Sequence, residues 1–245
     1  MKASTNPGKT KHIDRDLDVW ELGMVPYAAG VELQSRLVGE RRAGEIGDTL
    51  LLLQHPHVIT LGTGTHVENI LISPQEREAI GIEIHSAGRG GDVTYHGPGQ
   101  LVGYPILDLK PDRCDLHRYL RDLEEVLILT LADYGLNAAH REGMTGVWVG
   151  DRKLAAIGVR VSSGWITSHG FALNVSTDLG FFGTIVPCGI RDYEVGSLTG
   201  ELDQPVELQA VGKRLVKRFR QVFGFAERRG LSRAGTERTK EEPPE

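Results

Sequence analysis

The chain has 245 residues, of which 40% are hydrophobic and 25% charged. These values are ordinary for a globular protein that buries a substantial core. A formal net charge of -5 argues against general nucleic-acid binding. Only two cysteines occur, which excludes a disulfide framework and favours a reducing, cytoplasmic setting. The sequence contains no signal-peptide pattern and no apolar run near the ~20 residues of a membrane helix, so we expect no membrane association.

The chain is expected to form a single domain over residues 13–226, because no linker-like break or repeat interrupts it. Residues 1–12 are polar and are predicted to form a flexible arm. Residues 227–245 are charged and end in prolines, which predicts a disordered tail.

The first predicted helix runs from about Tyr27 to Gly44 and carries one apolar face. Residues 49–54 are a continuous apolar run, which predicts a strand buried on both faces. Residues 58–61 continue in β-branched residues and predict another strand. Residues 73–76 form a capping box with proline at the first helical position, so a short helix is expected to follow.

A glycine-rich polar stretch, residues 89–100, lies between predicted strands at residues 82–85 and 101–107. It has no apolar stripe to bury, so we expect a loop. So much glycine usually brings the backbone close to a ligand or to another segment. The stretch matches neither a P-loop nor a dinucleotide-binding motif. It therefore predicts a binding site without identifying the ligand.

The clearest predicted helix runs from about Leu116 to Tyr134, where leucines recur at helical spacing. Apolar runs predict further strands at residues 146–149, 153–161 and 165–175, the first two joined by a hairpin turn. A last helix is expected at about residues 207–223. Together these elements predict an α/β or α+β fold with a mixed β-sheet flanked by helices.

Cys188 lies between a proline and a glycine. It is either a buried cysteine that acts as a small hydrophobe or a reactive thiolate. The second case needs a nearby cation to lower the thiol pKa, and Lys153, His96 and His169 are the candidates. We interpret Cys114, at the start of the long helix, as incidental.

Lys153 begins an apolar strand after a tight turn. It either points to solvent or, if desolvated, serves as a general base or thiolate partner. His96 and His169 each precede a glycine and either line a cleft or are satisfied by the local backbone. No histidine pair has metal-ligand spacing, so we expect no metal site.

A basic cluster on the last helix comprises Lys213, Arg214, Lys217, Arg218 and Arg220. Such a cluster is either a solvated face or a docking patch for an acidic protein.

Five motifs together resemble the octanoyltransferases of lipoate biosynthesis, the lipoyl(octanoyl) transferase family. In chain order they are residues 53–62, 89–100, 153–158, 168–175 and 187–189. The resemblance implies the catalytic-domain fold of lipoate and biotin protein ligases. It also implies transfer of an octanoyl group from octanoyl-acyl carrier protein to a lysine of a lipoyl domain, with no cofactor and no metal. The acceptors would be 2-oxoacid dehydrogenase E2 subunits and the glycine cleavage H protein.

The same resemblance implies that Cys188 is the acyl-thioester nucleophile. Lys153 would lower the cysteine pKa and act as general acid and base. The implied substrate-binding residues are Arg89, Gly90, Gly91, Asp92, Val93, Thr94, Tyr95, His96, Ala156, Ile157, Gly158, His169, Gly170 and Phe171. Two alternatives stay open: an ATP-dependent lipoate or biotin ligase of the same fold, and a non-catalytic module that binds carrier or lipoyl domains.

Overall fold

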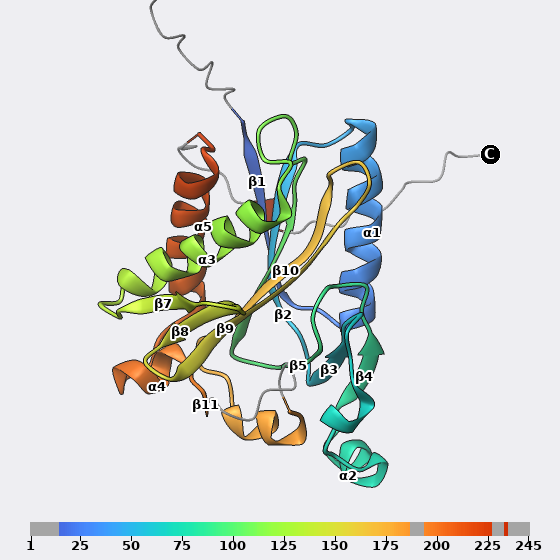
Figure 1. The fold of residues 1–245 in the computed structure, drawn as a ribbon, viewed down its shortest axis with the longest axis vertical. Coiled ribbons are helices and arrows are strands. Elements are labelled where there is room, and N and C mark those ends of the chain that lie inside the picture. The colour runs from blue at the N-terminus through green and yellow to red at the C-terminus, as the bar shows by residue number, and fades with distance from the viewer. Residues whose placement is uncertain (1–14, 187–193, 227–232, 235–245) are drawn as a thin grey trace, which may run out of the picture.

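A computed structural model describes residues 15–186, 194–226 and 233–234. These residues form a large mixed sheet with helices on both faces and a smaller sheet beside it (Figure 1). Helices α3 (Leu116–Ala132) and α5 (Leu208–Phe223) pack on one face of the large sheet. Helix α1 (Tyr27–Ala43) packs on the other. This arrangement confirms the fold class predicted from the sequence.

The large sheet contains nine strands within the described residues. They are β1 (Leu17–Met24), β2 (Asp48–Gln54), β6 (Gln100–Ile106), β7 (Ala138–Arg141), β8 (Met144–Val149), β9 (Arg152–Val161), β10 (Thr167–Asn174), β11 (Glu194–Val195) and β12 (Arg233–Ala234). Their order is β12-β1-β2-β6-β10-β9-β8-β7, with β11 paired to β9. Strand β1 is parallel to its two neighbours and β11 is parallel to β9, whereas the other pairs are antiparallel.

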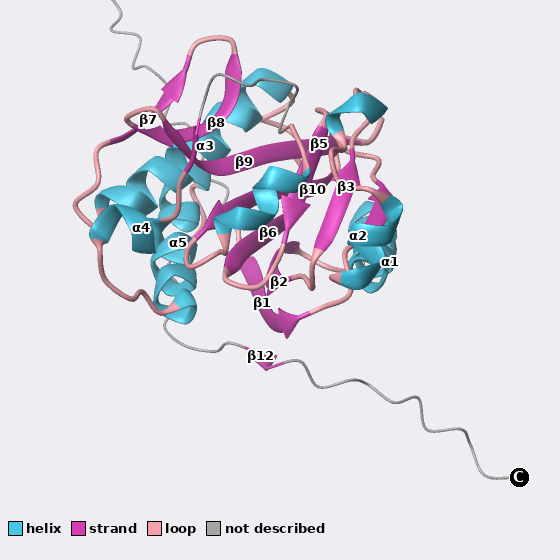
Figure 2. Ribbon diagram, turned by 90° about the horizontal axis from the view of Figure 1, so that it is seen from below, coloured by secondary structure: helices cyan, strands magenta, loops and turns pink. Residues whose placement is uncertain are grey.

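The small sheet has the order β4-β3-β5. Its strands are β3 (Val58–Leu61), β4 (Glu83–Ser86) and β5 (Val93–His96). Within the described residues the short helices are α2 (Pro74–Ala79) and α4 (Leu198–Leu202), and the 3₁₀ turns are η1 (Val67–Asn69) and η2 (Leu179–Thr184). Strand β3 of the small sheet lies on the side of the molecule where α1 and α2 are found (Figure 2). Phenylalanines of η2 pack against the small sheet and extend its apolar cluster.

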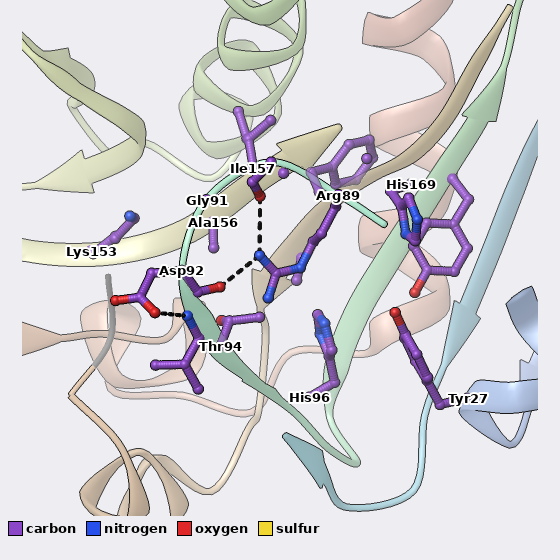
Figure 3. A pocket seen from close by; sticks show the side chains of 17 residues that line it. Tyr27, Arg89, Gly91, Asp92, Thr94, His96, Lys153, Ala156, Ile157 and His169 are labelled. Atoms are coloured by element: carbon purple, nitrogen blue, oxygen red, sulfur yellow. Dashed lines mark hydrogen bonds between the residues drawn. The ribbon is translucent and has the colours of Figure 1, made fainter. Parts of the chain in front are cut away.

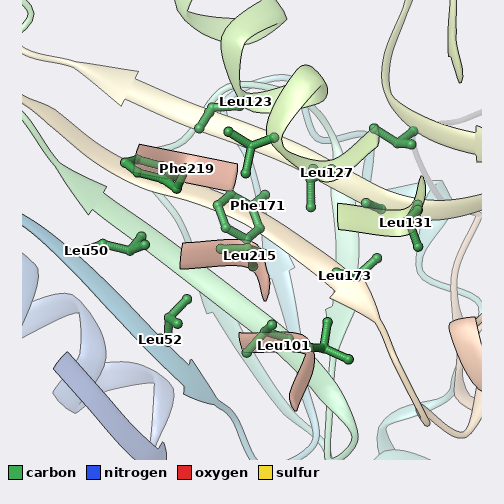
Figure 4. Packing of buried hydrophobic residues seen from close by; sticks show 14 of the residues in the cluster. Leu50, Leu52, Leu101, Leu123, Leu127, Leu131, Phe171, Leu173, Leu215 and Phe219 are labelled. Atoms are coloured by element: carbon green, nitrogen blue, oxygen red, sulfur yellow. The ribbon is translucent and has the colours of Figure 1, made fainter. Parts of the chain in front are cut away.

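Strand β2 shows how a continuous apolar run serves both faces of the large sheet. Leu50 and Leu52 join the cluster under α3 and α5 (Figure 4), whereas Leu51 and Leu53 join the cluster under α1. Successive side chains of a strand point to opposite faces, so both faces must be apolar when both are covered. The predicted doubly buried strand is therefore confirmed.

Local capping signals fix the ends of several helices as the sequence predicted. Gly44 and Gly224 adopt left-handed conformations that end α1 and α5. Ser73 and Glu76 form the reciprocal capping box that starts α2. These ends depend on chemistry within a few residues, which explains why the sequence alone located them.

The prediction of a loop over residues 89–100 was wrong in part, because residues 93–96 form β5. Val93 and Tyr95 are buried in the small sheet, while Thr94 and His96 alternate with them. This short alternation is hidden by the surrounding glycines, and only pairing with β3 reveals the strand. The sequence analysis also missed β1, β7, β11 and the short helix at Leu198–Leu202.

Within the range predicted as a tail, residues 233 and 234 pair with Trp20 and Glu21 of β1. The predicted N-terminal arm and the remainder of that tail lie outside the described residues. Among the described helices, none combines the length and the apolar character needed to cross a membrane.

Gly103 of β6 lies opposite Phe171 of β10, and a Cβ at position 103 would stand 2.1 Å from the Phe171 ring. We expect Gly103→Ala to lower the free energy of unfolding by about 1–3 kcal/mol, because the packed ring must move. Urea unfolding measures this change.

Gly39→Ala is the matched control, because Gly39 lies in α1 with nothing within 4 Å of the added methyl group. It should raise stability by about 0.5–1 kcal/mol. A Gly103→Ala protein as stable as the wild type would contradict the packing described here.

Candidate active site

A pocket lies where the small sheet meets strands β9 and β10 of the large sheet (Figure 3). Its lining residues are Tyr27, Arg89, Gly90, Gly91, Asp92, Val93, Thr94, His96, Tyr104, Lys153, Ala156, Ile157, Gly158, His169, Gly170, Phe171 and Ala172. The fold thus brings together Lys153 and every substrate-binding residue expected from the sequence except Tyr95. Cys188 lies outside the described residues.

Tyr95 belongs to the other side of β5. Its hydroxyl oxygen lies 2.6 Å from Nδ1 of His57, and its ring stacks on Phe181 at a centroid distance of 5.4 Å. Strand alternation explains the separation, because Tyr95 stands between two residues that line the pocket. Its structural place is the core of the small sheet.

Three pocket residues were missed by the sequence analysis: Tyr27, Tyr104 and Ala172. Tyr27 is the first residue of α1 and was interpreted only as part of the helix's apolar face. Tyr104 lies within the buried strand β6, where a hydroxyl group is unusual. Such a polar group inside an apolar strand was the available signal, since a buried tyrosine hydroxyl usually has a partner.

Arg89 is only 7% exposed, and its terminal nitrogens bond to the chain. Nη2 donates to the carbonyl oxygen and Oγ1 of Thr60, at 2.7 and 2.8 Å. Nη1 donates to the carbonyl oxygens of Asp92 and Gly90, at 2.8 and 3.1 Å (Figure 3). The guanidinium therefore shapes the pocket wall by holding the 89–92 segment against β3.

Two glycines make room for this arginine. A Cβ on Gly158 would stand 2.9 Å from Cδ of Arg89, and one on Gly62 would stand 2.7 Å from Nη1. The amide of Gly90 also donates to the carbonyl oxygen of Val159 on β9, at 3.0 Å. The glycine-rich motifs thus permit close approach of the two sheets, as their composition suggested.

His96 is held in its neutral form with a defined tautomer. Its Nδ1 lies 2.7 Å from Oε1 of Gln100, whose Nε2 donates to Oδ1 of Asn174 at 2.9 Å. The Gln100 oxygen is thus the acceptor, so Nδ1–H of His96 donates and Nε2 keeps its lone pair. Burial lowers the pKa of His96 to about 3, with a smaller contribution from nearby His55.

His169 is neutral for the same reason. Burial, followed by the charges of Arg89 and Arg160, lowers its pKa to about 4. Its backbone is left-handed, with φ of 56°, and its amide donates to Oε1 of Gln34 at 2.7 Å. That hydrogen bond from α1 stabilises a conformation that is unfavourable for a non-glycine residue.

Behind the pocket, His55 fixes Tyr104. His55 Nδ1 donates to the carbonyl oxygen of Val25 at 2.6 Å, so Nε2 accepts from the Tyr104 hydroxyl at 2.8 Å. Burial lowers the pKa of His55. The hydroxyl of Tyr27 is buried without a hydrogen-bond partner among the described residues and points into the pocket (Figure 3). This wall therefore consists of uncharged polar groups.

Lys153 lies on the pocket side of β9 and is only 7% exposed. Its Nζ stands 4.9 Å from the centre of the Trp148 ring, in a cation–π arrangement. Its carbonyl oxygen accepts from the amide of Gly196 at 3.0 Å, which ties β9 to β11. The structure rules out the alternative in which this lysine points to solvent.

The segment that precedes Cys188 is fixed by η1. The amide of Val186 donates to the carbonyl oxygen of Asn69 at 2.8 Å. The side-chain nitrogen of Asn69 donates to Oδ2 of Asp92 at 2.5 Å, and Oδ1 of Asp92 accepts from the amide of Val93 at 2.7 Å. Both oxygens of the Asp92 carboxylate thus accept hydrogen bonds from the protein itself. Within the expected substrate-binding segment, this side chain has a structural role.

Two other candidates from the sequence lie away from the pocket. In the basic cluster, Arg214 and Arg218 bond to Asp133 at the end of α3. Cys114 is exposed near the start of α3. No group of three or more His, Cys, Asp or Glu residues within the described ranges could hold a metal ion.

Comparison with known proteins agrees with this geometry. The family described as lipoyl protein ligase A/B catalytic domain matches residues 26–220. The octanoyltransferase of Rubrobacter xylanophilus is 54% identical over 210 residues, covering 85% of this chain and 94% of the relative. That of Solibacter usitatus is 51% identical over 214 residues, covering 87% and 96%.

Among solved structures, a bi-partite lipoate protein ligase from Thermoplasma acidophilum superposes with a TM-score of 0.68 at 17% identity, covering 88% of this chain and 87% of that one. At this identity the likeness concerns the fold alone, and it confirms the expected ligase-type architecture. The high identity to octanoyltransferases over nearly their whole length carries the functional assignment. The chain therefore belongs to the octanoyltransferase family, within the lipoyl protein ligase A/B catalytic domains, and is an acyltransferase.

Proposed function

We propose that this protein transfers an octanoyl group from octanoyl-acyl carrier protein to a lysine of lipoyl domains, through an acyl thioester on Cys188. This is the first step of lipoate biosynthesis, and we infer a cytoplasmic setting for it. The observation that carries the proposal is the buried ammonium of Lys153 at the pocket. A lysine held out of water beside an aromatic ring suits the activation of a neighbouring thiol.

Lys153 would act first by electrostatics. A cation ~4 Å from an anion gains about 4 kcal/mol at an effective dielectric constant near 20. Such a gain would lower a thiol pKa of about 8.5 by a unit or more after desolvation is subtracted. The centre of the Trp148 ring lies 4.9 Å from Nζ, and its negative face attracts the ammonium.

The chemistry would proceed in two balanced steps. The Cys188 thiolate attacks the octanoyl carbonyl, a new C–S bond forms, and the carrier thiolate leaves and takes a proton from Lys153. The acceptor lysine amine then attacks the acyl-enzyme, a C–N bond forms, and the Cys188 sulfur leaves while Lys153 accepts the amine proton. The two protein substrates would use the site in turn, which implies ping-pong kinetics.

The pocket suits an uncharged acyl chain. Ala156, Ile157 and Phe171 supply apolar wall, and the histidines beside them are neutral at pH 7 because their pKa values lie at about 3 and 4. Each buried methylene contributes about 0.8 kcal/mol, so an eight-carbon chain gains several kcal/mol. A neutral histidine avoids placing a charge against that chain.

Lipoyl domains are the acceptor class that the family assignment favours. The Thermoplasma acidophilum ligase of the same fold was solved in a study that includes its E2 lipoyl domain. We extend this acceptor class to 2-oxoacid dehydrogenase E2 subunits and the H protein. The ATP-dependent ligase alternative is less favoured, because the lipoate ligase matches at 17% identity and the octanoyltransferases at about 50%. Transfer from octanoyl-carrier protein without ATP would separate the two.

Cys188→Ser is expected to abolish the acyl-enzyme, because a serine hydroxyl at neutral pH is a far weaker nucleophile than a thiolate. Intact-mass measurement after incubation with octanoyl-carrier protein should show an adduct of about 126 Da on the wild type and none on the variant. Cys114→Ser is the control and should keep the adduct, since Cys114 lies near α3, away from the pocket. An adduct retained on Cys188→Ser would refute the assignment.

Lys153→Met should lower kcat by on the order of 10²–10⁴, the usual contribution of a positioned acid or base. Without the cation the thiol pKa rises, so the rate of Cys188 alkylation by iodoacetamide should reach half its maximum at a higher pH. Lys110→Met, which changes an exposed lysine 54% open to solvent, should leave both quantities unchanged. An unaltered alkylation profile in Lys153→Met would count against the dyad.

The neutral His96 predicts acid sensitivity of the fold. Its folded pKa of about 3 lies below the unfolded value of about 6.5, so the unfolded chain binds more protons between these values. As far as His96 is concerned, the free energy of unfolding is therefore highest above pH 6.5 and falls as the pH drops towards 3. Between pH 6.5 and pH 5 this one group should cost about 2 kcal/mol, at 1.36 kcal/mol per pKa unit.

Urea unfolding at pH 7 and pH 5 measures this loss, which should be smaller in His96→Gln. The control is His66→Gln, whose side chain is 70% exposed and should leave the loss unchanged. Identical pH dependence in the wild type and His96→Gln would show that His96 is not the source.

A further inference from the structure

Glu124 of α3 is a buried carboxylate that the proposed reaction does not use. It is only 2% exposed, and its Oε1 accepts from the amide of Gly146 at 3.0 Å. Its Oε2 accepts from Nη1 of Arg121 at 2.5 Å. A buried carboxylate is tolerated only where hydrogen bonds compensate its lost hydration. These bonds therefore fix Glu124 against strand β8.

Gly146 links this carboxylate to the pocket lysine. Its φ of 135° belongs to a region that residues with a Cβ rarely adopt. A Cβ at this position would stand 2.6 Å from Cε of Lys153 and 2.6 Å from the carbonyl oxygen of Ala155. The lysine side chain thus lies directly against the bare Cα of Gly146.

The strand pairing around this contact is irregular. Val147 pairs with Ala155, whereas the next residue, Trp148, pairs with Lys153, so the register shifts between them. The shift places Lys153 within reach of both Trp148, whose ring centre lies 4.9 Å from Nζ, and Gly146. Strand β8 therefore forms the surface on one side of the lysine. Helix α3 holds that part of β8 in place through the hydrogen bond from the Gly146 amide to Glu124.

We propose that Glu124 is a positioning residue for Lys153: by holding the amide of Gly146, it fixes the glycine backbone on which the lysine side chain lies. A lysine has four rotatable carbon–carbon bonds, and its ammonium keeps one position only where neighbouring surfaces restrict it. The bare Cα of Gly146 is such a surface, and it stays in place only while its amide is bonded. The role of Lys153 in transfer rests on the proposed function, whereas its placement by Glu124 does not.

Two substitutions at position 124 separate the hydrogen bond from the charge. Glu124→Gln keeps an acceptor oxygen for the Gly146 amide, so we expect kcat within about twofold of the wild type. Glu124→Leu removes the acceptor, and kcat should fall about tenfold or more with KM unchanged, since a misplacement of ~1 Å can cost on the order of 10²-fold. A Glu124→Gln protein as impaired as Glu124→Leu, or an unimpaired Glu124→Leu, would overturn the proposal.

A double substitution tests whether Glu124 acts through the lysine. In a Lys153→Met background, Glu124→Leu should cause no further loss of kcat, because the group it positions is already absent. Fully additive losses would show that Glu124 acts elsewhere and would overturn the proposal. Gly146→Ala is a second variant with the same expected phenotype, because its Cβ would collide with Cε of Lys153.

A measurement that needs no turnover keeps this test separate from the proposed function. Competitive labelling with acetic anhydride, followed by peptide mass analysis, reports the reactivity of Lys153 itself. Glu124→Leu and Gly146→Ala should change that reactivity about threefold or more by releasing a buried side chain, while Glu124→Gln should match the wild type. Equal labelling in all four proteins would refute the positioning role, even if Lys153→Met proved fully active and the proposed function failed.

Thr130→Val is the matched control for loss of stability. Thr130 is also fully buried on α3. Its Oγ1 donates to the carbonyl oxygen of Val126 at 2.7 Å, so this hydrogen bond stays within the helix. When its melting temperature equals that of Glu124→Leu, the Thr130→Val protein should keep wild-type kcat and wild-type Lys153 labelling. A matching defect in Thr130→Val would show that general loosening of α3 explains the effect and would overturn the proposal.

Discussion

The two sheets are joined through the guanidinium of Arg89. Its Nη2 holds Thr60 in the small sheet, and its Nη1 holds the carbonyl oxygens of Gly90 and Asp92. The amide of Gly90 in turn bonds to Val159 in the large sheet. Because burial of a guanidinium is costly unless hydrogen bonds compensate its lost hydration, the bonds of Nη1 and Nη2 favour this arrangement of the segment. The pocket lies between the segment that Arg89 holds and strands β9 and β10 of the large sheet.

The pocket has two regions that differ in charge. Along one wall, His96 and His169 are kept neutral by burial, and Tyr104 is oriented by His55. At the other side, Lys153 is buried against Trp148 and Gly146. An uncharged chain suits the first region and an anionic sulfur the second. A single acyl thioester has both parts, which is why the geometry fits the proposed reaction.

The sequence predicted elements best where short-range chemistry decides. The capping box of α2 and the doubly buried strand β2 depend on residues within one segment, and both were confirmed. The β5 strand was missed because its pairing partner, β3, is distant in sequence and its own pattern is only four residues long. Tyr95 was grouped with the pocket because motif membership does not tell which face of a strand a side chain occupies.

The sequence by itself determined the family, through five short motifs in order, and it determined ends of α1, α2 and α5 through glycine, proline and capping residues. Only the tertiary structure decided which groups meet: that Tyr27 joins the pocket, that Lys153 is buried, and that Glu124 reaches Gly146. The physical reason is distance along the chain. Hydrogen bonds within a turn are encoded by neighbouring residues, whereas contacts between strands and helices depend on sheet order and register, which arise only when the whole core packs.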